Sequence, residues 1–190
     1  MCISSLFILF FVCDMQSEIL NCEVPHLTKT LIFENTKYDV ASPKLPFRYI
    51  AVVTQYQAKL NSEELGKVVR KQLGGSRNSH NYQLASEDDT VKLTGFVYNS
   101  VVPIGMTHAK IVAWTDLGLT QEPLETKQEE DKGERTMEPI PLMITKSIVD
   151  HVSFIYLGGG HVHCKCKLTL REILGNPKLF GCPLVADISS

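Results

Sequence analysis

Two apolar runs begin the regular part of the hydrophobic pattern. Residues 29–33 (KTLIF) and residues 48–57 (RYIAVVTQYQ) are rich in β-branched and aromatic side chains, which favour the pleated backbone of a strand. A polar stretch that contains proline, around residues 42–46, separates the two runs and is typical of a loop. The pattern therefore predicts two strands joined by a long connection.

The next segment has the spacing of a helix. Asn61 is an N-cap candidate, two acidic residues follow it in the first turn, and Gly74-Gly75 ends the pattern. The apolar side chains that recur at helical spacing are Leu65, Val68, Val69 and Leu73. We therefore expect a short helix here.

The middle of the chain is less regular. Residues 82–85 predict the end of a strand, residues 87–92 predict a capped helical turn, and residues 94–105 (TGFVYNSVVPIG) predict a turn that ends in Pro-x-Gly. From residue 107 to residue 138 the periodicity disappears, and the acidic half of this segment is typical of a solvated loop. We expect residues 107–138 to be a loop-like insertion.

Regular elements return at Pro139. Residues 139–150 (PIPLMITKSIVD) predict a strand that runs into a helix, residues 152–160 (VSFIYLGGG) predict a strand that ends in a glycine loop, and residues 161–168 (HVHCKCKL) predict an alternating strand. The pattern up to this point contains more strands than helices.

A helix is expected after these strands, where Thr169 is an N-cap candidate and Glu172 stands at the capping-box position. Residues 176–190 contain two prolines and are expected to be irregular. Because strands and helices mix without strict alternation, the predicted fold class is α/β of the mixed α+β kind. We expect a mixed, partly barrel-like sheet with packed helices.

Composition indicates a single domain, and the net charge is only weak evidence about function. The chain has 190 residues, 44% of them hydrophobic and 21% charged, which suits one well-buried domain. Its net charge of −2 produces no global positive field, although a local basic face could hold a short piece of RNA. Residues 121–138 alone carry a net charge of −4, so the remainder is mildly basic.

Cysteine usage favours a reducing compartment and a cytoplasmic location. The six cysteines are scattered without a regular disulfide spacing. Residues 5–13 (SLFILFFVC) could form the core of a signal peptide, but no basic segment precedes them and no small-x-small cleavage site follows. A buried strand or an imperfect gene start are the alternatives. The run is too short to cross a membrane as a helix, so no membrane partner is expected.

Four common catalytic signatures are missing from the sequence. It contains no P-loop, no H-E-x-x-H, no C-x-x-C pair and no G-x-S-x-G, so the usual phosphate, zinc and serine-nucleophile motifs are not available. The function must use a less standard set of residues.

A metal site on residues 161–166 is a further alternative. His161 and His163 alternate with valine and precede Cys164 and Cys166, and all four are zinc-ligand types. On an extended strand the two histidines face one side and the two cysteines the other, so one ion cannot bind all four. A site completed from elsewhere would use an unassigned histidine: His26, His80, His108 or His151. We expect no metal and treat a metal-binding module as the least favoured hypothesis.

Three separated features form a constellation: Lys29 at the start of a strand, the turn at residues 94–105, and the loop Gly158-Gly159-Gly160. Their order and spacing resemble the YbaK/ProX-type aminoacyl-tRNA deacylase family, whose domains also occur inserted in bacterial prolyl-tRNA synthetases. The matching pieces are KTLIF at Lys29, the helix with its double glycine, TGFVYNSVVPIG, IYLGGG and the closing TLREIL.

The resemblance implies a domain over residues 28–175, interrupted at 107–138. Residues 1–27 would be an atypical N-terminal segment without helical periodicity, and residues 176–190 a tail. It also implies a hydrolase that needs no cofactor, because an aminoacyl ester is already activated and needs an oriented water and backbone N–H donors.

By the resemblance, Lys29 would position the phosphate or ribose of the terminal adenosine, and Gly159 would lie beside the scissile ester. The residues implied to bind substrate are Thr94, Gly95, Tyr98, Asn99, Ser100, Pro103, Gly105, Gly158, Gly160 and His161. Asn99 stands where the family has glycine, and asparagine tolerates the left-handed backbone that such a turn needs. His161 and His163 replace acidic residues of the family pattern.

The implied activity is removal of a mischarged small amino acid, of the alanine or cysteine type, from a tRNA such as that for proline. The partners would be the acceptor end of tRNA and an aminoacyl-tRNA synthetase. The alternative is a catalytically weak relative that binds tRNA or a synthetase without hydrolysis.

Overall fold

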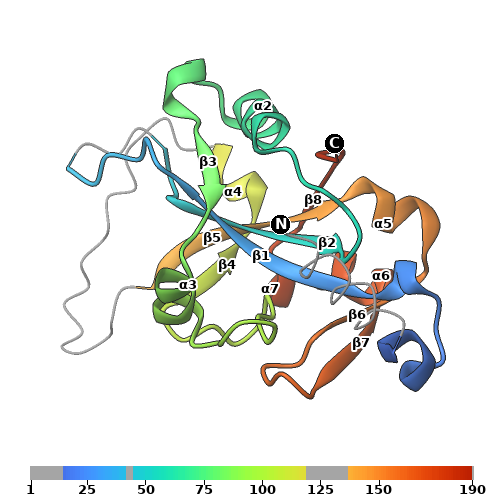
Figure 1. Cartoon of the computed structure of the whole chain (residues 1–190). Helices are drawn as coiled ribbons and strands as arrows, with labels where there is room; N and C mark the ends of the chain where they lie inside the picture. The colour runs from blue at the N-terminus through green and yellow to red at the C-terminus, as the bar shows by residue number, and fades with distance from the viewer. Residues whose placement is uncertain (1–14, 42–44, 119–136, 190) are drawn as a thin grey trace, which may run out of the picture.

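The computed structural model describes residues 15–41, 45–118 and 137–189, and its centre is a mixed sheet (Figure 1). The strands run in the order β3-β1-β2-β5-β4, and β8 also pairs with β5. Their bounds are β1 (Thr28–Asn35), β2 (Tyr49–Gln55), β3 (Tyr82–Leu84), β4 (Ala109–Val112), β5 (Glu138–Thr145) and β8 (Leu184–Ala186). A separate antiparallel hairpin is formed by β6 (Phe154–Gly158) and β7 (Lys165–Thr169).

The central strands β2 and β5 are parallel neighbours, with Ala51 opposite Leu142 and Val53 opposite Ile144. Both strands are apolar over almost their whole length and are buried on both faces, as parallel strands in a covered sheet usually are. β1 is antiparallel to β2, and β3 is antiparallel to β1. The prediction of a mixed sheet with packed helices is therefore confirmed.

The helices divide between the two faces of this sheet (Figure 1). Their bounds are η1 (Val24–His26), α2 (Ser62–Leu73), η2 (Arg77–Ser79), α3 (Glu87–Thr94), α4 (Trp114–Gly118), α5 (Lys146–His151), α6 (Leu170–Leu174) and α7 (Pro177–Phe180). Side chains of α2 and α4 pack in one core cluster with Ile50 and Val52 of β2. Side chains of α5, α6 and α7, together with the hairpin, pack in the other cluster with Ala51 and Val53.

Local sequence explains the helix ends. The side chain of Asn61 accepts hydrogen bonds from the backbone N–H groups of Glu63 (2.9 Å) and Glu64 (3.4 Å), as its N-cap position predicts. The capping box at the start of α6 also forms, with Glu172 accepting from Thr169. These hydrogen bonds lower the pKa of the Glu172 carboxyl.

The prediction of a loop over residues 107–138 is wrong for its first part, because β4 and α4 lie there. β4 pairs in parallel with β5, and the indole N–H of Trp114 donates to the carbonyl of Leu142 at 2.6 Å. β4 has only four residues (AKIV), one of them a lysine, and this was too short for periodicity to reveal it. Residues 119–136 lie outside the described part of the chain.

The prediction of an irregular segment over residues 176–190 is also wrong. It contains α7 and β8, and β8 pairs in parallel with Met143 to Thr145 of β5. The partner of β8 is distant in the sequence, so local pattern could not indicate it. Near the other end of the chain, residues 15–20 are helical although no helical periodicity was detected, while residues 5–13 lie outside the described residues.

The alternating strand expected over residues 161–168 begins only at Lys165. His161 to Cys164 instead form the turn of the β6–β7 hairpin, because Gly160 has a φ of +79° and the N–H of Cys164 donates to the carbonyl of His161 at 2.9 Å. The argument that the histidines and cysteines occupy opposite faces of one strand therefore does not apply.

The cap of α2 can be tested by substitution. Asn61→Ala should lower the free energy of unfolding by about 1 kcal/mol, because two helix N–H groups lose their acceptor. Urea denaturation would measure this loss. Asn61→Asp keeps an acceptor and should remain close to wild type; equal stability of the alanine and aspartate variants would contradict the cap.

Candidate functional site

The outer edge of β1 is only partly paired. β2 pairs with β1 from Thr28 to Glu34, whereas β3 pairs with it only from Phe33 to Asn35. At the start of the strand an isolated parallel bridge joins Leu27 to Tyr156 of β6. The bond that follows the β3 pairing runs from the N–H of Ala85 to the carbonyl of Ile32 at 2.9 Å. Beyond it, toward the start of the strand, a pocket of about 390 Å³ opens along residues 28–32, and we call it the β1-edge pocket.

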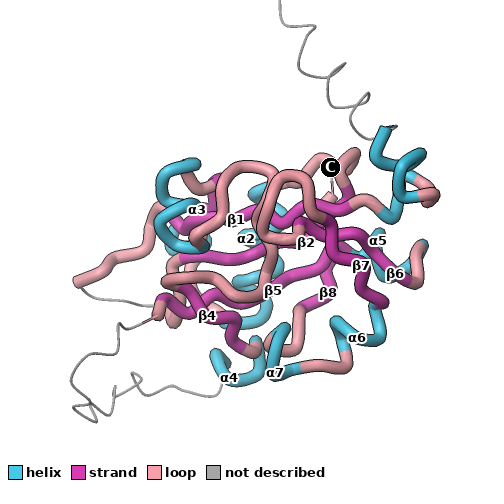
Figure 2. Tube along the Cα trace, turned by 90° about the horizontal axis from the view of Figure 1, so that it is seen from below, coloured by secondary structure: helices cyan, strands magenta, loops and turns pink. Residues whose placement is uncertain are grey.

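Three further segments complete the β1-edge pocket. α3 contributes Glu87, Thr90 and Val91, the loop after α3 contributes Phe96, Tyr98, Asn99 and Val101, and the hairpin contributes Gly158. The walls are mostly apolar. In Figure 1, α3 and the hairpin lie below the sheet and α2 lies above it, and Figure 2 views the molecule from the side of α3 and the hairpin. The pocket therefore lies on the face opposite α2.

Lys29 lines the pocket and contacts Tyr56. Its ammonium donates to the carbonyl of Tyr56 at 3.2 Å and lies 5.9 Å from the centre of the Tyr56 ring. The ammonium of Lys165 reaches the same ring, at 5.1 Å, and donates to the Tyr56 hydroxyl at 3.0 Å. Two positive charges therefore flank one buried tyrosine at this end of the pocket.

Thr30 adds a buried polar group to the pocket. Thr30 is only 6% exposed, and its hydroxyl has no hydrogen-bond partner among the described residues. The neighbouring hydroxyl of Thr28, by contrast, donates to the carbonyl of Tyr156 at 2.9 Å. A buried hydroxyl without a partner costs free energy, so Thr30 is suited to bind a polar group that enters the pocket.

The two loops expected to form the walls of the site are in contact with each other. The N–H of Gly160 donates to the carbonyl of Ser100 at 3.2 Å. A Cβ atom on Gly158 would lie 2.6 Å from the carbonyl oxygen of Val101, so only glycine allows this approach. Asn99 has a φ of +65°, the left-handed conformation that was predicted for it.

Of the residues expected to act on substrate, four line the β1-edge pocket: Lys29, Tyr98, Asn99 and Gly158. Thr94 is buried, and its hydroxyl donates to the carbonyl of Thr90 at the end of α3. Gly95 ends that helix with a φ of +77°. Both residues support the loop from outside the pocket.

The remaining expected residues also lie outside the pocket. Pro103 and Gly105 line a separate, smaller depression near β4. The N–H of Gly159 donates to the carbonyl of Cys164 at 3.0 Å, within the hairpin turn. His161 is exposed in the same turn, where its Nδ1 accepts from the N–H of His163 at 3.3 Å.

Sequence reasoning missed Thr30, Tyr56 and Glu87, which also line the pocket. The alternation of threonine with lysine at the start of β1 was a signal for Thr30, because it puts a polar side chain on each face of the strand. No sequence signal pointed to Tyr56, which follows β2 and comes near Lys29 only through the register of the two strands.

The described residues do not form a metal centre. No group of three or more potential ligands from histidine, cysteine, aspartate and glutamate gathers in residues 15–41, 45–118 and 137–189. His161 and His163 come close, with ring centres 5.4 Å apart, but both side chains are exposed in the turn.

The fold is similar to that of several solved structures. One similar structure is a candidate trans-editing enzyme for prolyl-tRNA synthetase, with a TM-score of 0.59 and 16% identity, over 94% of this chain and 79% of that chain. A scaffold protein from a computational epitope-grafting study has a TM-score of 0.61 and 13% identity, over 94% and 80%. A hypothetical protein has a TM-score of 0.57 and 19% identity, over 94% and 83%.

These similarities establish the fold alone, since every identity is low. No protein-family model matches the sequence, and no curated protein is similar to it. Within the described part of the chain, none of the helices has both the length and the apolar character needed to cross a bilayer.

The contact between the two loops depends on Gly158. Gly158→Ala should lower the free energy of unfolding by about 1–3 kcal/mol, because the added methyl group would force the loop at Val101 away from the hairpin. Thermal unfolding would report a lower Tm. Gly66→Ala is the control, since its Cβ would meet nothing closer than 3.4 Å and alanine favours the helix. A Gly158→Ala protein as stable as wild type would show that the contact is not tight.

Proposed function

We propose that this chain is an aminoacyl-tRNA deacylase that hydrolyses the ester of a mischarged small amino acid, of the alanine or cysteine type. One observation carries the proposal: a single pocket gathers Lys29, Asn99 and Gly158 from three distant segments. The fold shared with a candidate trans-editing enzyme for prolyl-tRNA synthetase supports it, and makes a tRNA for proline the first substrate to test.

The pocket offers suitable surroundings for an aminoacyl ester. Its apolar wall, which includes Val91 and Val101, would receive the side chain of the amino acid, and the carboxylate of Glu87 would attract the α-ammonium group. Lys29 would hold the phosphate or ribose of the terminal adenosine. Binding in this orientation brings the ester carbonyl to the open edge of β1.

The proposed reaction needs only water. A water molecule attacks the ester carbon and the bond to the ribose oxygen breaks. One proton of the water passes to that oxygen, the other is released to solvent, and the amino acid leaves as a carboxylate. Because the N–H groups of Gly159 and Gly160 already donate within the protein, the hydroxyl of Thr30 is the proposed donor to the developing oxyanion. The two glycines would then shape the hairpin turn beside the pocket.

A basic and aromatic face beside the pocket fits the single-stranded acceptor end of tRNA. Lys165 adjoins Tyr56, and the ammonium of Lys167 lies 4.0 Å from the ring centre of Phe154 and 5.8 Å from that of Tyr156. Ammonium groups would neutralise phosphates while exposed parts of the rings stack on bases. A synthetase is proposed as a second partner in the cytoplasm.

We propose that the catalytic unit comprises residues 28–175 together with the residues that follow them as far as 188. β8 pairs with β5, and Ile188 is fully buried in the core, so residues up to 188 belong to the same folding unit.

A second candidate is a relative that binds tRNA without hydrolysis. The observation that favours it is the use of both the Gly159 and the Gly160 N–H groups inside the protein, at 3.0 Å and 3.2 Å, which removes two backbone donors from the site.

The assay is release of labelled alanine from alanyl-tRNA for proline by the full chain. Lys29→Ala should reduce the rate about a hundredfold, because the substrate loses its positioning cation. Lys178→Ala, an exposed lysine on α7, is the matched control and should keep the wild-type rate. Wild-type release no faster than in buffer would contradict hydrolysis, and tRNA retained in a mobility shift under those conditions would then favour the binding candidate.

A further inference from the structure

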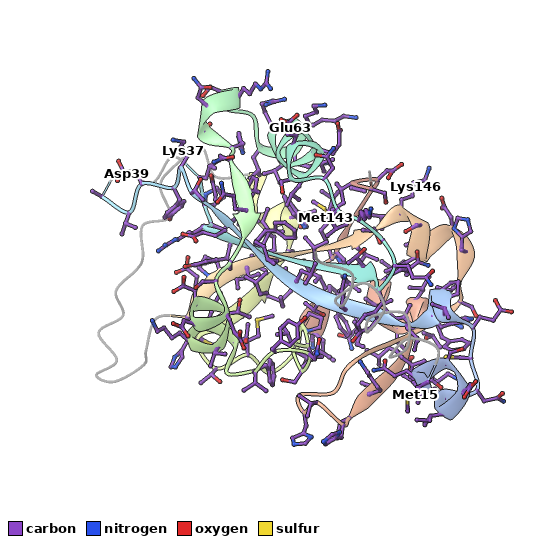
Figure 3. All side chains as sticks on the ribbon, viewed as in Figure 1. Met15, Lys37, Asp39, Glu63, Met143 and Lys146 are labelled. Atoms are coloured by element: carbon purple, nitrogen blue, oxygen red, sulfur yellow. The ribbon has the colours of Figure 1, made fainter. Side chains whose placement is uncertain are left out.

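The opposite face of the sheet carries a second hollow, which is not used by the proposed function. It has a volume of about 530 Å³ and lies between α2, η2 and the segment that follows β1. Figure 3 shows Lys37 and Glu63, which both line it, on the side of the sheet where α2 lies. We call it the α2 basin.

Positive charge dominates the α2 basin. Its charged lining residues are Lys37, Lys67, Arg70, Arg77 and Glu63. Lys67 forms an ion pair with Glu64 at 2.6 Å, whereas the other three cations have no ion pair with any described residue. Because the whole chain has a net charge of −2, such a concentration of unneutralised cations is a local feature rather than a consequence of composition.

The three cations without an ion pair come from three different segments. Lys37 follows β1, Arg70 lies in the last turn of α2, and Arg77 begins η2. Gly66 has no side chain and leaves room on the face of α2 that borders the basin. The fold thus gathers charge from separate parts of the chain around one concave surface, which is how anion sites are built.

Two residues that line the basin each carry a buried polar atom with no hydrogen-bond partner among the described residues. His80 is 8% exposed; its Nε2 contacts the carbonyl of Gly74 at 2.9 Å, and its Nδ1 has no hydrogen-bond partner among the described residues. Tyr82 is 1% exposed, and its hydroxyl likewise has none. Both residues line the basin. Buried polar atoms normally have a partner, so these two indicate that something polar belongs here.

We propose that the α2 basin binds a phosphoryl group. Arg70 and Arg77 present planar guanidinium groups that match the oxygens of a phosphate, and Lys37 adds a third charge. The phosphoryl group could belong to a polynucleotide backbone or to a phosphorylated small molecule, since the recognition chemistry is the same. The site is separate from the β1-edge pocket, which lies on the other face of the sheet.

The test is calorimetric titration of the full chain with inorganic pyrophosphate at low salt. Wild type should bind, and Arg70→Gln and Arg77→Gln should each weaken the affinity about tenfold, the effect of losing one charge-assisted contact. Lys146→Gln is the control, because Lys146 is exposed on α5, away from Lys37 (Figure 3). Arg77 is exposed, so its replacement should leave the fold intact.

Two results would overturn the proposal. One is the lack of pyrophosphate binding by the wild-type chain. The other is an equal loss of affinity in Lys146→Gln and the two arginine variants, which would mean that pyrophosphate responds only to the overall charge of the protein. Displacement of pyrophosphate by a short single-stranded RNA would support the site and identify a polynucleotide as the source. Displacement by adenosine monophosphate alone would support it with a small phosphorylated ligand. Either result is independent of whether the chain hydrolyses aminoacyl-tRNA.

Discussion

The one-sided pairing of β1 is the constraint on which the rest of the structure depends. β2 satisfies one edge of this strand from Thr28 to Glu34, but β3 covers only its last residues on the other edge. A strand edge with unpaired backbone groups must be covered or put to use. Here α3, the loop after it and the hairpin surround the edge without filling it, and the β1-edge pocket results.

The sequence predicts those parts of the fold that depend on local interactions. The two first strands, α2 with its Asn61 cap and the capping box at Thr169 are all confirmed, because alternation and capping act within a few residues. β4 and β8 are missed, because each is short and is stabilised by a distant partner, β5. The turn at His161 is missed because Gly160, with a positive φ, turns the chain there, so the expected strand begins only at Lys165.

The candidate site also combines features that depend on local sequence with features that depend on tertiary packing. The left-handed backbone of Asn99 could be predicted, since it depends on one residue. The contact of Lys29 with Tyr56 could not, because it depends on strand register, nor could the contact between Ser100 and Gly160, because it depends on tertiary packing. Pro103 and Gly105 belong to the expected motif but line another depression, so neighbours in sequence need not share a surface.

The shared use of β5 also has a consequence for how fast the chain folds. On one edge β5 pairs with β2, and on the other it pairs with β4 along its first half and with β8 along its second. All three partnerships are parallel, and the one with β2 joins segments far apart in the chain. Loop-closure entropy must be overcome before such pairs form. The sheet should therefore assemble slowly, on the millisecond-to-second scale typical of domains dominated by non-local contacts.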